Sequence, residues 1–276
     1  MKIAALKIAF VGGGNMAAAL IGGLVAKGHD ATRISVIELS PAAREKLAAR
    51  HPVRVTTAPD VAMKGADTVV LAVKPQDMKR ALASLGSEVR GALVISVAAG
   101  IGIETLSRWL GGHRRIVRCM PNTPALIGAG ITGLYASQDV GQEDRKKAET
   151  ILSAVGEVVW LAEERLLDPV TAVSASGPAY VFWFIEQLAA SAVKLGIPKD
   201  DALKLAKHTV LGAARLAVSS DKDPSELRKD VTSKGGTTEA ALNVFEEEKL
   251  AERFIRAVEA ASKRGEEMGK EWGGKD

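Results

Sequence analysis

The chain has 276 residues, a formal net charge of +4 at pH 7 and one cysteine. Hydrophobic residues make up 47% and charged residues 25%, an ordinary globular composition that argues against disorder, and the length indicates two domains or one large one. One cysteine excludes a disulfide framework and a multi-cysteine metal site. Basic residues are spread along the chain and aromatics are only 4%, so we expect no nucleic-acid partner.

The first predicted elements lie in an uncharged stretch, residues 8–26, which follows Lys2 and Lys7. Such a stretch is also typical of a signal peptide or a short membrane span. Its glycines would weaken one continuous helix, since each costs about 0.8–1 kcal/mol relative to alanine. A strand, a tight turn and a helix account for the same residues better. We therefore expect a cytoplasmic chain that does not interact with membranes.

Short β-branched runs then alternate with helical stretches as far as residue 161. The apolar runs predict strands at residues 7–11, 34–37, 68–72, 93–97, 115–118 and 157–161. Helical patterns lie between them, such as residues 41–50, which start with a proline, and residues 76–85. Strands that are apolar on both faces and separated by helices predict a parallel sheet covered on both sides.

The pattern changes after Asp168-Pro169, and the boundary falls near residues 162–168. Helices are predicted at residues 178–195, 200–219, 224–230, 238–248 and 250–267, with no further strand. Residues 179–185 are apolar nearly all round, so that helix must be buried on all sides. A partner subunit or a bound ligand would bury it.

Gly12-x-Gly14-x-x-Ala17 follows the first predicted strand and opens a helix. Small residues at this spacing allow a tight turn, close approach of backbone to a pyrophosphate, and close packing of helix on strand. The N–H groups at the start of the helix favour an anion. The motif predicts a dinucleotide site, and the alternative is a glycine-rich turn without a ligand.

Glu38 ends the second predicted strand. A carboxylate there bonds the ribose hydroxyls of NAD and repels the 2′-phosphate of NADP. Leu39, Ser40 and Arg44 could still line a phosphate pocket. Glu38 could instead be a surface residue. The choice between NAD and NADP stays open, and the carboxylate of Glu38 slightly favours NAD.

Loops at the carboxyl ends of later strands should line the same crevice. They contain Ala72, Val73, Lys74, Pro75, Ala98 and Asn122. Lys74 is either catalytic or simply exposed, and Cys119 is more typical of a buried small hydrophobe than of a nucleophile. The four histidines have no metal-ligand spacing, so we expect no metal site.

Residues 230–238 form a second candidate anion-binding corner, because glycines and threonines precede a predicted helix. No strand comes before this corner, so a small carboxylate suits it better than a dinucleotide. The alternative is that Thr237 or Thr238 only caps the helix.

Five motifs together carry a resemblance to a known family. They are residues 11–16 (VGGGNM), 72–76 (AVKPQ), 118–124 (RCMPNTP), 174–180 (SASGPAY) and 231–238 (VTSKGGTT). Over nearly its whole length the chain resembles the pyrroline-5-carboxylate reductases, and the last motif is that family's own signature. Lys234 stands where members usually have proline, and Ala175 replaces the commoner glycine.

The resemblance implies a nicotinamide-dependent oxidoreductase that reduces 1-pyrroline-5-carboxylate to L-proline with NADPH or NADH, the last step of proline biosynthesis. It implies a Rossmann-type α/β domain at residues 1–165, followed by an all-α substrate-binding and dimerisation domain at 166–276. It also implies a homodimer that assembles into a larger ring, such as a decamer.

The motifs and the resemblance together nominate the site residues. Thr238 is the expected catalytic hydrogen-bond donor to the ring nitrogen. The expected cofactor contacts are Gly12, Gly14, Asn15, Met16, Glu38, Ser40, Ala72, Val73, Lys74, Pro75, Ala98 and Asn122. The expected substrate contacts are Ser233, Gly235, Gly236, Thr237 and Thr238.

Two alternatives have other functions. Another NAD(P)-dependent imine reductase or a β-hydroxyacid dehydrogenase would share both halves, but typically has a catalytic Lys or Asp on the helix after the linker. Here that helix opens Ser176-Gly-Pro-Ala-Tyr180, and its opening residues include neither. A non-catalytic nucleotide-sensing protein would not need an intact second anion corner.

Overall fold

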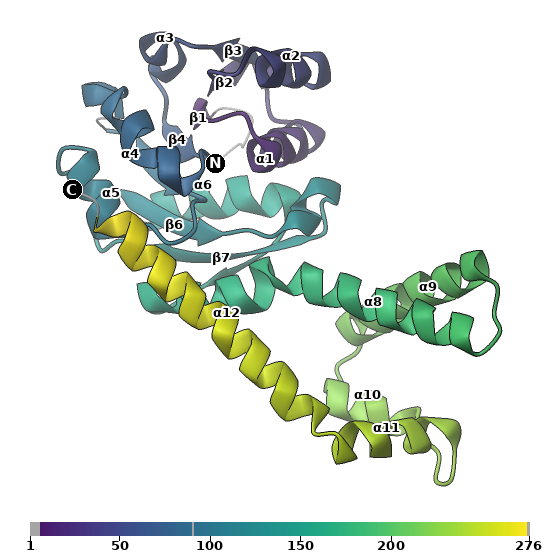
Figure 1. Ribbon diagram of the computed structural model, residues 1–276. Helices are drawn as coiled ribbons and strands as arrows, with labels where there is room; N and C mark the ends of the chain where they lie inside the picture. The colour runs from purple at the N-terminus through teal and green to yellow at the C-terminus, as the bar shows by residue number, and fades with distance from the viewer. Residues whose placement is uncertain (1–5, 90, 275–276) are drawn as a thin grey trace. The chain divides into compact units, whose positions relative to one another are not determined.

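The computed structural model describes residues 6–89 and 91–274, and its contacts divide them into two compact units (Figure 1). The first unit runs to Ser176 and also takes in the end of the chain from Ala261. The second unit is Gly177–Ala260. The expected domains, residues 1–165 and 166–276, are defined by their roles in nucleotide binding and in substrate binding and dimerisation. Contacts alone do not test those roles, so that division stays a prediction.

The first unit is built on a sheet with strand order β3-β2-β1-β4-β5-β6-β7-β8. The strands are β1 Ile8–Val11, β2 Ile34–Ile37, β3 Arg54–Thr56, β4 Thr68–Leu71, β5 Leu93–Ser96, β6 Ile116–Met120, β7 Gly130–Ala136 and β8 Gly156–Trp160. Neighbouring strands are parallel except for β6 and β7, which pair antiparallel. The order reverses between β1 and β4, so their carboxyl ends form a topological switch point.

Each predicted strand is present, but β3 and β7 were not predicted. β3 has three residues, too few to give a periodic pattern. β7 contains Gly133, which reads as a loop residue in sequence. The structure needs a glycine there because a Cβ would lie 2.9 Å from Cγ1 of Val170, on the short helix packed against the strand.

Helices cover both faces of this sheet. In the first unit they are α1 Asn15–Ala26, α2 Pro41–Arg50, α3 Pro59–Met63, α4 Pro75–Ala83, α5 Ile103–Trp109, α6 Gln142–Leu152, α7 Leu167–Val170 and the last part of α12 Leu250–Gly273. A proline in the first turn starts α2, α3 and α4, because its fixed φ suits a helix and its missing N–H costs nothing there.

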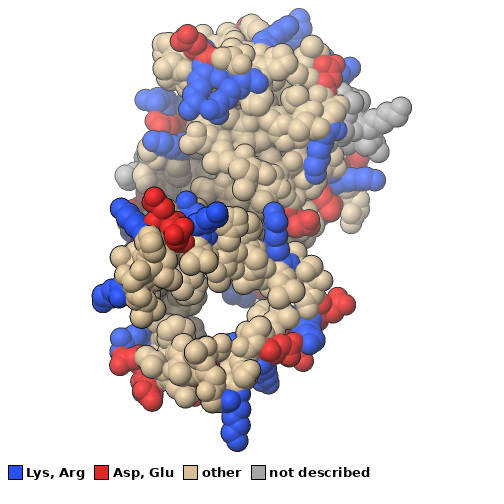
Figure 2. Space-filling view, turned by 90° about the vertical axis from the view of Figure 1, so that its right-hand side faces the viewer, with Lys and Arg blue, Asp and Glu red and all other residues tan. Residues whose placement is uncertain are grey.

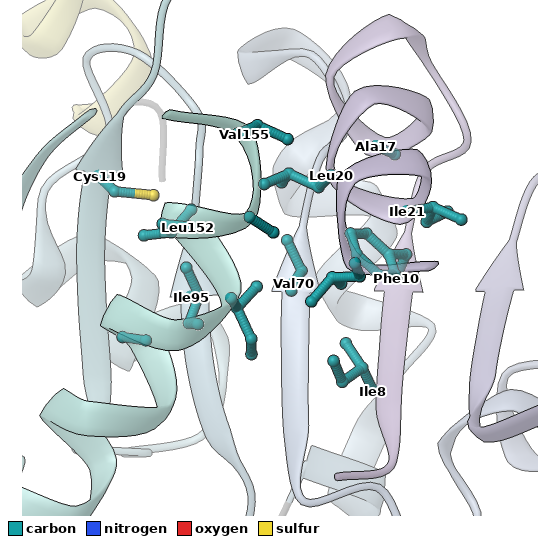
Figure 3. Packing of buried hydrophobic residues seen from close by; sticks show 14 of the residues in the cluster. Ile8, Phe10, Ala17, Leu20, Ile21, Val70, Ile95, Cys119, Leu152 and Val155 are labelled. Atoms are coloured by element: carbon teal, nitrogen blue, oxygen red, sulfur yellow. The ribbon is translucent and has the colours of Figure 1, made fainter. Parts of the chain in front are cut away.

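Apolar side chains on the two faces of the strands form two core clusters. On one face the cluster includes Phe10 of β1, Leu20 of α1 and Leu152 of α6 (Figure 3). On the other face Val11 packs with Met78 of α4. All five side chains are at most 3% exposed, and burying such a side chain stabilises the fold by about 1.5–3 kcal/mol. This double burial explains why the strands are apolar throughout rather than alternating.

Residues 8–26 form β1, a turn and α1, as their glycines predicted. Over the described ranges, no helix is long and apolar enough to cross a membrane. Figure 2 shows basic and acidic side chains interspersed over the face that it presents.

The second unit consists of helices. They are α8 Gly177–Lys194, α9 Lys199–Ser219, α10 Pro224–Asp230, α11 Thr237–Glu247 and the first part of α12. The rings of Tyr180 and Phe254 meet edge to face, with centroids 5.8 Å apart. Other apolar side chains of α8 are not covered within one chain: Phe182 is 60% and Trp183 56% exposed.

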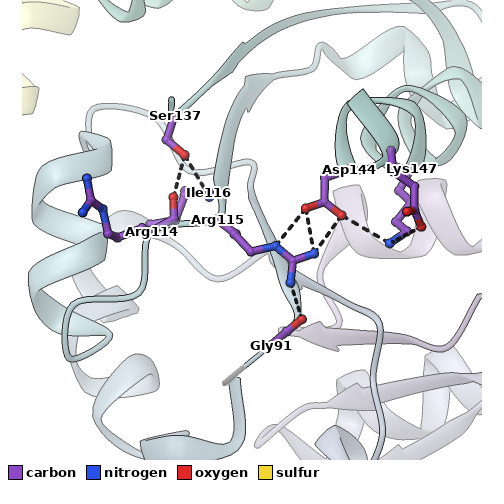
Figure 4. Close-up of polar contacts among 8 residues, drawn as sticks. Gly91, Arg114, Arg115, Ile116, Ser137, Asp144 and Lys147 are labelled. Carbon is purple, nitrogen blue, oxygen red and sulfur yellow. Dashed lines mark hydrogen bonds and ion pairs between the residues drawn. The ribbon is translucent and has the colours of Figure 1, made fainter. Parts of the chain in front are cut away.

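A charged network ties β6 to α6 in the first unit (Figure 4). The guanidinium of Arg115 donates to both carboxylate oxygens of Asp144, at 2.8 and 2.9 Å, and to the carbonyl of Gly91. Lys147 Nζ lies 3.2 Å from the same carboxylate. The Asp144 side chain is only 8% exposed, so these charge-assisted hydrogen bonds replace its water.

Replacing Asp144 with asparagine should therefore destabilise the protein. Asp144→Asn leaves the Arg115 guanidinium without its carboxylate, while Lys147 keeps Glu143 at 3.1 Å. We expect a loss of roughly 2 kcal/mol in free energy of unfolding, the scale of a hydrogen bond to a charged group. Asp139→Asn is the control, because Asp139 pairs with an arginine that is 73% exposed and should contribute less than about 1 kcal/mol. Urea denaturation at one fixed protein concentration measures both, and equal losses would contradict the account.

Candidate functional site

A cavity of about 590 Å³ lies at the carboxyl ends of β1, β2 and β4. Its volume is typical of small-molecule sites, and its place at the switch point is where open α/β sheets bind ligands. Seven predicted cofactor residues line it: Gly12, Gly14, Glu38, Ser40, Ala72, Val73 and Lys74. The structure thus brings together residues from three separate segments of the sequence.

The backbone of Gly12 makes the first turn of this cavity possible. Its φ is +98°, and a Cβ there would lie 2.8 Å from the carbonyl oxygen of Ala72. Its N–H donates to the carbonyl of Ile37, 2.8 Å away. Only glycine allows this conformation and this contact together, so β1, β2 and β4 end at one shared point.

Gly14 has a different task. It is the N-cap of α1, its φ is −70°, and a Cβ added to it would meet nothing within 4 Å. No side chain caps this helix end. Among the described residues, no side chain therefore satisfies the first N–H groups of α1. These uncapped N–H groups, with their partial positive charge, suit a diphosphate. Asn15 and Met16, also predicted cofactor contacts, begin the same helix.

Glu38 is half-buried at the cavity wall and is not a free surface residue. One carboxylate oxygen accepts from Gly13 N–H and the other from Ser40 N–H, each at 2.8 Å. Each oxygen keeps a lone pair for a further donor. The carboxylate is thus fixed where the hydroxyls of an adenosine ribose could donate to it.

Cations near the cavity are mostly engaged by the protein. Arg44 donates to the carbonyls of Glu38 and Leu39, and Arg80 pairs with Asp77 at 2.9 Å. Lys74 is exposed and forms the N-cap of α4, just before Pro75. Lys74 therefore has room to approach a phosphate, and no contact marks it as a catalytic group.

The sequence missed several lining residues. They are Val11, Ile37, Thr57, Pro59, Asp77, Arg80, Ala81 and Ser84. Leu39, which the sequence suggested together with Ser40, also lines the cavity. Thr57 and Pro59 follow β3, so predicting that strand would have found them. Asp77 and Arg80 lie in the first turns of α4, directly after the predicted loop.

Ala98 and Asn122 do not line this cavity. Ala98 follows β5 and is buried in the core cluster on the α4 side. The amide of Asn122 is used at both ends, because its nitrogen donates to Ser174 and its oxygen accepts from Ile131 N–H. A cofactor contact at either position stays a prediction.

The second anion corner lies in the second unit, at the start of α11. Gly236 is the N-cap, so neither Thr237 nor Thr238 caps the helix. Gly235 N–H donates to the carboxylate of Glu239, and Gly236 N–H donates to the carbonyl of Ser233.

The two threonines that follow supply further donors to this corner. Within residues 6–89 and 91–274, neither their N–H groups nor their hydroxyls have a hydrogen-bond partner. Thr238 is half-buried, and Lys234 is exposed in the preceding loop. The corner thus offers two adjacent N–H groups and a hydroxyl to a small anionic ligand.

Cys119 has no catalytic setting. Its thiol is buried, contacts the Ser96 carbonyl, and has its pKa raised by burial, which disfavours the thiolate. Burial also lowers the pKa of His51 and His113. Among the described residues, no three His, Cys, Asp or Glu side chains are grouped to hold a metal ion.

The residues of the cavity fit a nicotinamide dinucleotide. An uncapped helix N-terminus behind an open Gly14 suits its diphosphate, and the fixed Glu38 carboxylate suits its adenosine ribose. A parallel sheet with this site, followed by a helical unit, defines a two-domain nicotinamide-dependent oxidoreductase.

Comparisons with known proteins identify the family. Residues 164–268 match the family model for pyrroline-5-carboxylate reductase dimerisation, and residues 7–100 match the model described as NADP oxidoreductase coenzyme F420-dependent. The pyrroline-5-carboxylate reductase of Pseudomonas aeruginosa is 44% identical over 97% of this chain and 98% of its own length. The chain therefore belongs to the pyrroline-5-carboxylate reductase family, as its motifs predicted.

Solved structures agree with that assignment. The pyrroline-5-carboxylate reductase of Coxiella burnetii has a TM-score of 0.91 and 42% identity, covering 95% of this chain and 98% of that chain. The Plasmodium falciparum enzyme, solved with NADP bound, has a TM-score of 0.85 and 28% identity, covering 96% of this chain and 99% of that chain.

The cofactor assignment predicts the effect of a side chain at Gly14. Gly14→Val should leave the fold intact and lower the free energy of unfolding by about 1 kcal/mol, because valine is a poorer N-cap than glycine. It should weaken the binding of NADH and NADPH, because the side chain blocks the diphosphate. Gly141→Val is a matched control, because Gly141 is also an uncapped N-cap with nothing within 4 Å of its Cβ position. Calorimetric titration measures both. Unchanged nucleotide affinity in Gly14→Val would exclude the assignment.

A second prediction concerns the choice between the two nucleotides. Glu38→Ser removes the charge that repels a 2′-phosphate, so the ratio of kcat/KM values should shift towards NADPH by about 1–2 kcal/mol, the scale of a charged hydrogen bond. Glu45→Ser makes the same charge change at an exposed site of α2 and should leave the ratio as it is. Equal ratios in the two variants would mean that Glu38 does not contact the ribose.

Proposed function

We propose that this chain reduces 1-pyrroline-5-carboxylate to L-proline with NADPH or NADH, the last step of proline biosynthesis. The observation that carries the proposal is the start of α11. There the family's signature loop presents two N–H groups and the Thr238 hydroxyl with no partner in the described part of the chain. These donors suit a ligand that combines a carboxylate with a ring nitrogen.

The first unit holds the hydride donor. The start of α1 at Gly14 binds the diphosphate, and Glu38 binds the adenosine ribose. The loops at residues 72–75 and 96–100 and Asn122 flank the nicotinamide end. When bound, the reduced nicotinamide supplies a hydride. The fixed carboxylate of Glu38 gives the site a preference for NADH over NADPH.

The second unit holds the substrate. The substrate carboxylate binds at the positive end of α11, to the N–H groups of Thr237 and Thr238 and the Ser233 hydroxyl. The backbone of Gly235 and Gly236 shapes this loop. Lys234 adds a positive charge to this loop. Both glycine N–H groups are already bonded, so the two threonines carry most of the contact.

Thr238 also serves the chemistry. The imine carbon accepts the hydride, and the electron pair of the C=N double bond moves to the ring nitrogen, which takes up a proton. The Thr238 hydroxyl donates a hydrogen bond to that nitrogen as its electron density rises. The remaining task is to hold donor and acceptor in near-attack geometry, which can supply about 7–11 kcal/mol of the barrier.

The assembly uses the second unit. The dimerisation model covers all of it, and the chain forms a homodimer. We propose that the exposed rings of α8, such as Phe182 and Trp183, are buried between the two subunits of the dimer. The dimers assemble further into a larger ring, such as a decamer. The enzyme works in the cytoplasm, away from membranes.

A steady-state assay tests the function. Adding 1-pyrroline-5-carboxylate to the purified protein should oxidise NADH or NADPH and form an equal amount of L-proline, which chromatography measures. A β-hydroxy acid with NAD or NADP should give no turnover. Turnover of the hydroxy acid alone would favour the dehydrogenase alternative, and nucleotide binding without turnover would favour a sensor.

The role of Thr238 can be separated from helix stability. Thr238→Val keeps the shape and the N–H group but removes the hydroxyl, so kcat/KM for the imine should fall about 10²-fold, the low end for general acid–base catalysis, while cofactor affinity stays the same. Thr238→Ser keeps the donor and should retain most of the activity. A Thr238→Val enzyme with a lower melting temperature but full turnover would exclude the catalytic role.

A further inference from the structure

The loop at residues 97–102 joins β5 to α5 at the carboxyl end of the sheet, where open α/β sheets bind ligands. Ala98 anchors its first half by packing into the core cluster on the α4 side, where it is 5% exposed. Gly100, in its second half, has a φ of +75°. Two further contacts, both from residues far along the chain, hold this second half.

The first contact comes from the last turns of α12. Gly269 packs directly on Gly100, and a Cβ on Gly269 would lie 3.1 Å from the Gly100 carbonyl oxygen. Two more contacts hold the same end of α12 in place. Arg108 of α5 donates to the Gly273 carbonyl, and Trp272 packs on the core cluster on the α4 side of the sheet. A side chain at Gly269 would therefore push the loop, since the helix has little freedom to retreat.

The second contact comes from Glu164. One of its carboxylate oxygens accepts from Ile103 N–H, the first residue of α5, at 2.8 Å, and from the Arg118 guanidinium at 2.7 Å. The Arg118 side chain is 9% exposed on β6, next to β5 in the sheet. Glu164 thus ties the end of the loop to the sheet.

We propose that Gly269 and Glu164 are positioning residues, which set the Ala98–Gly100 loop so that it holds the nicotinamide ring in the orientation that hydride transfer needs. This proposal rests on the proposed function. The diphosphate and ribose contacts lie on other loops, at Gly14 and Glu38, so a shift of this loop should alter the chemical step and leave nucleotide affinity unchanged. A misplacement of about 1 Å can cost 10²-fold in rate.

Gly269→Ala gives the direct test. It should lower kcat at least 10-fold, change the dissociation constant of NADH less than 2-fold, and leave the melting temperature the same or higher, because alanine favours a helix. Gly265→Ala is the matched control one turn earlier, where a Cβ would make only an ordinary contact, 3.8 Å from the Asp168 Cβ. Its kcat should stay within 2-fold of the wild type.

Amide hydrogen exchange in the nucleotide-free protein gives a second readout. The amides of residues 97–103 should exchange faster in Gly269→Ala and in Glu164→Gln than in Gly265→Ala. In Glu164→Gln the reason is that a neutral amide binds Arg118 and the Ile103 N–H less strongly than a carboxylate does. Equal exchange and equal kcat in the two glycine variants would overturn the proposal. Parallel losses of kcat, NADH affinity and melting temperature would overturn it too, because they indicate a general structural role.

The same measurements separate this proposal from the proposed function. A wild-type protein without pyrroline-5-carboxylate reduction contradicts the function, while the exchange data still report on the loop. An active wild type in which the loop exchanges faster but kcat is unchanged contradicts the positioning role alone.

Discussion

The close approach of Gly12 to Ala72 is the contact on which the rest of the nucleotide site depends. β1 and β4 lie side by side, so the chain leaving β1 must turn sharply where β4 ends. A φ of +98° at Gly12 makes that turn, and any side chain there would strike the Ala72 carbonyl. The turn leads into α1 and brings Gly13 N–H to Glu38. One backbone conformation thus shapes both places that we propose as nucleotide contacts, the start of α1 for the diphosphate and Glu38 for the ribose.

The two units divide the chemistry between them. The first unit supplies a rigid nucleotide cavity whose walls are strand ends and helix starts, which are held by cores on both faces of the sheet. The second unit supplies a small polar corner with unpartnered donors, on helices whose apolar side chains one chain leaves exposed. Dimer formation, which the family's dimerisation model indicates for residues 164–268, buries such a surface.

Much of this was readable in the sequence, because it is encoded locally. The strand around Phe10, the glycine turn after it and the helical second half all follow from periodicity and from glycine and proline positions. Contacts between distant residues were not readable. No local pattern indicates that Glu164 binds Ile103 N–H or that Gly269 packs on Gly100. Gly133 reads as a loop residue in the sequence, although it lies inside β7. The strand needs a glycine there because Val170 packs against it.

The proposed reaction is direct hydride transfer from the nicotinamide to the ring carbon of the imine. It is tested by reducing 1-pyrroline-5-carboxylate in ordinary water with NADH that carries deuterium at C4 of the nicotinamide on the transferred face. Mass spectrometry of the product should find L-proline with one deuterium, at the carbon that was double-bonded to nitrogen. Proline without deuterium from either C4-deuterated face, or deuterium released to the solvent, would contradict the account.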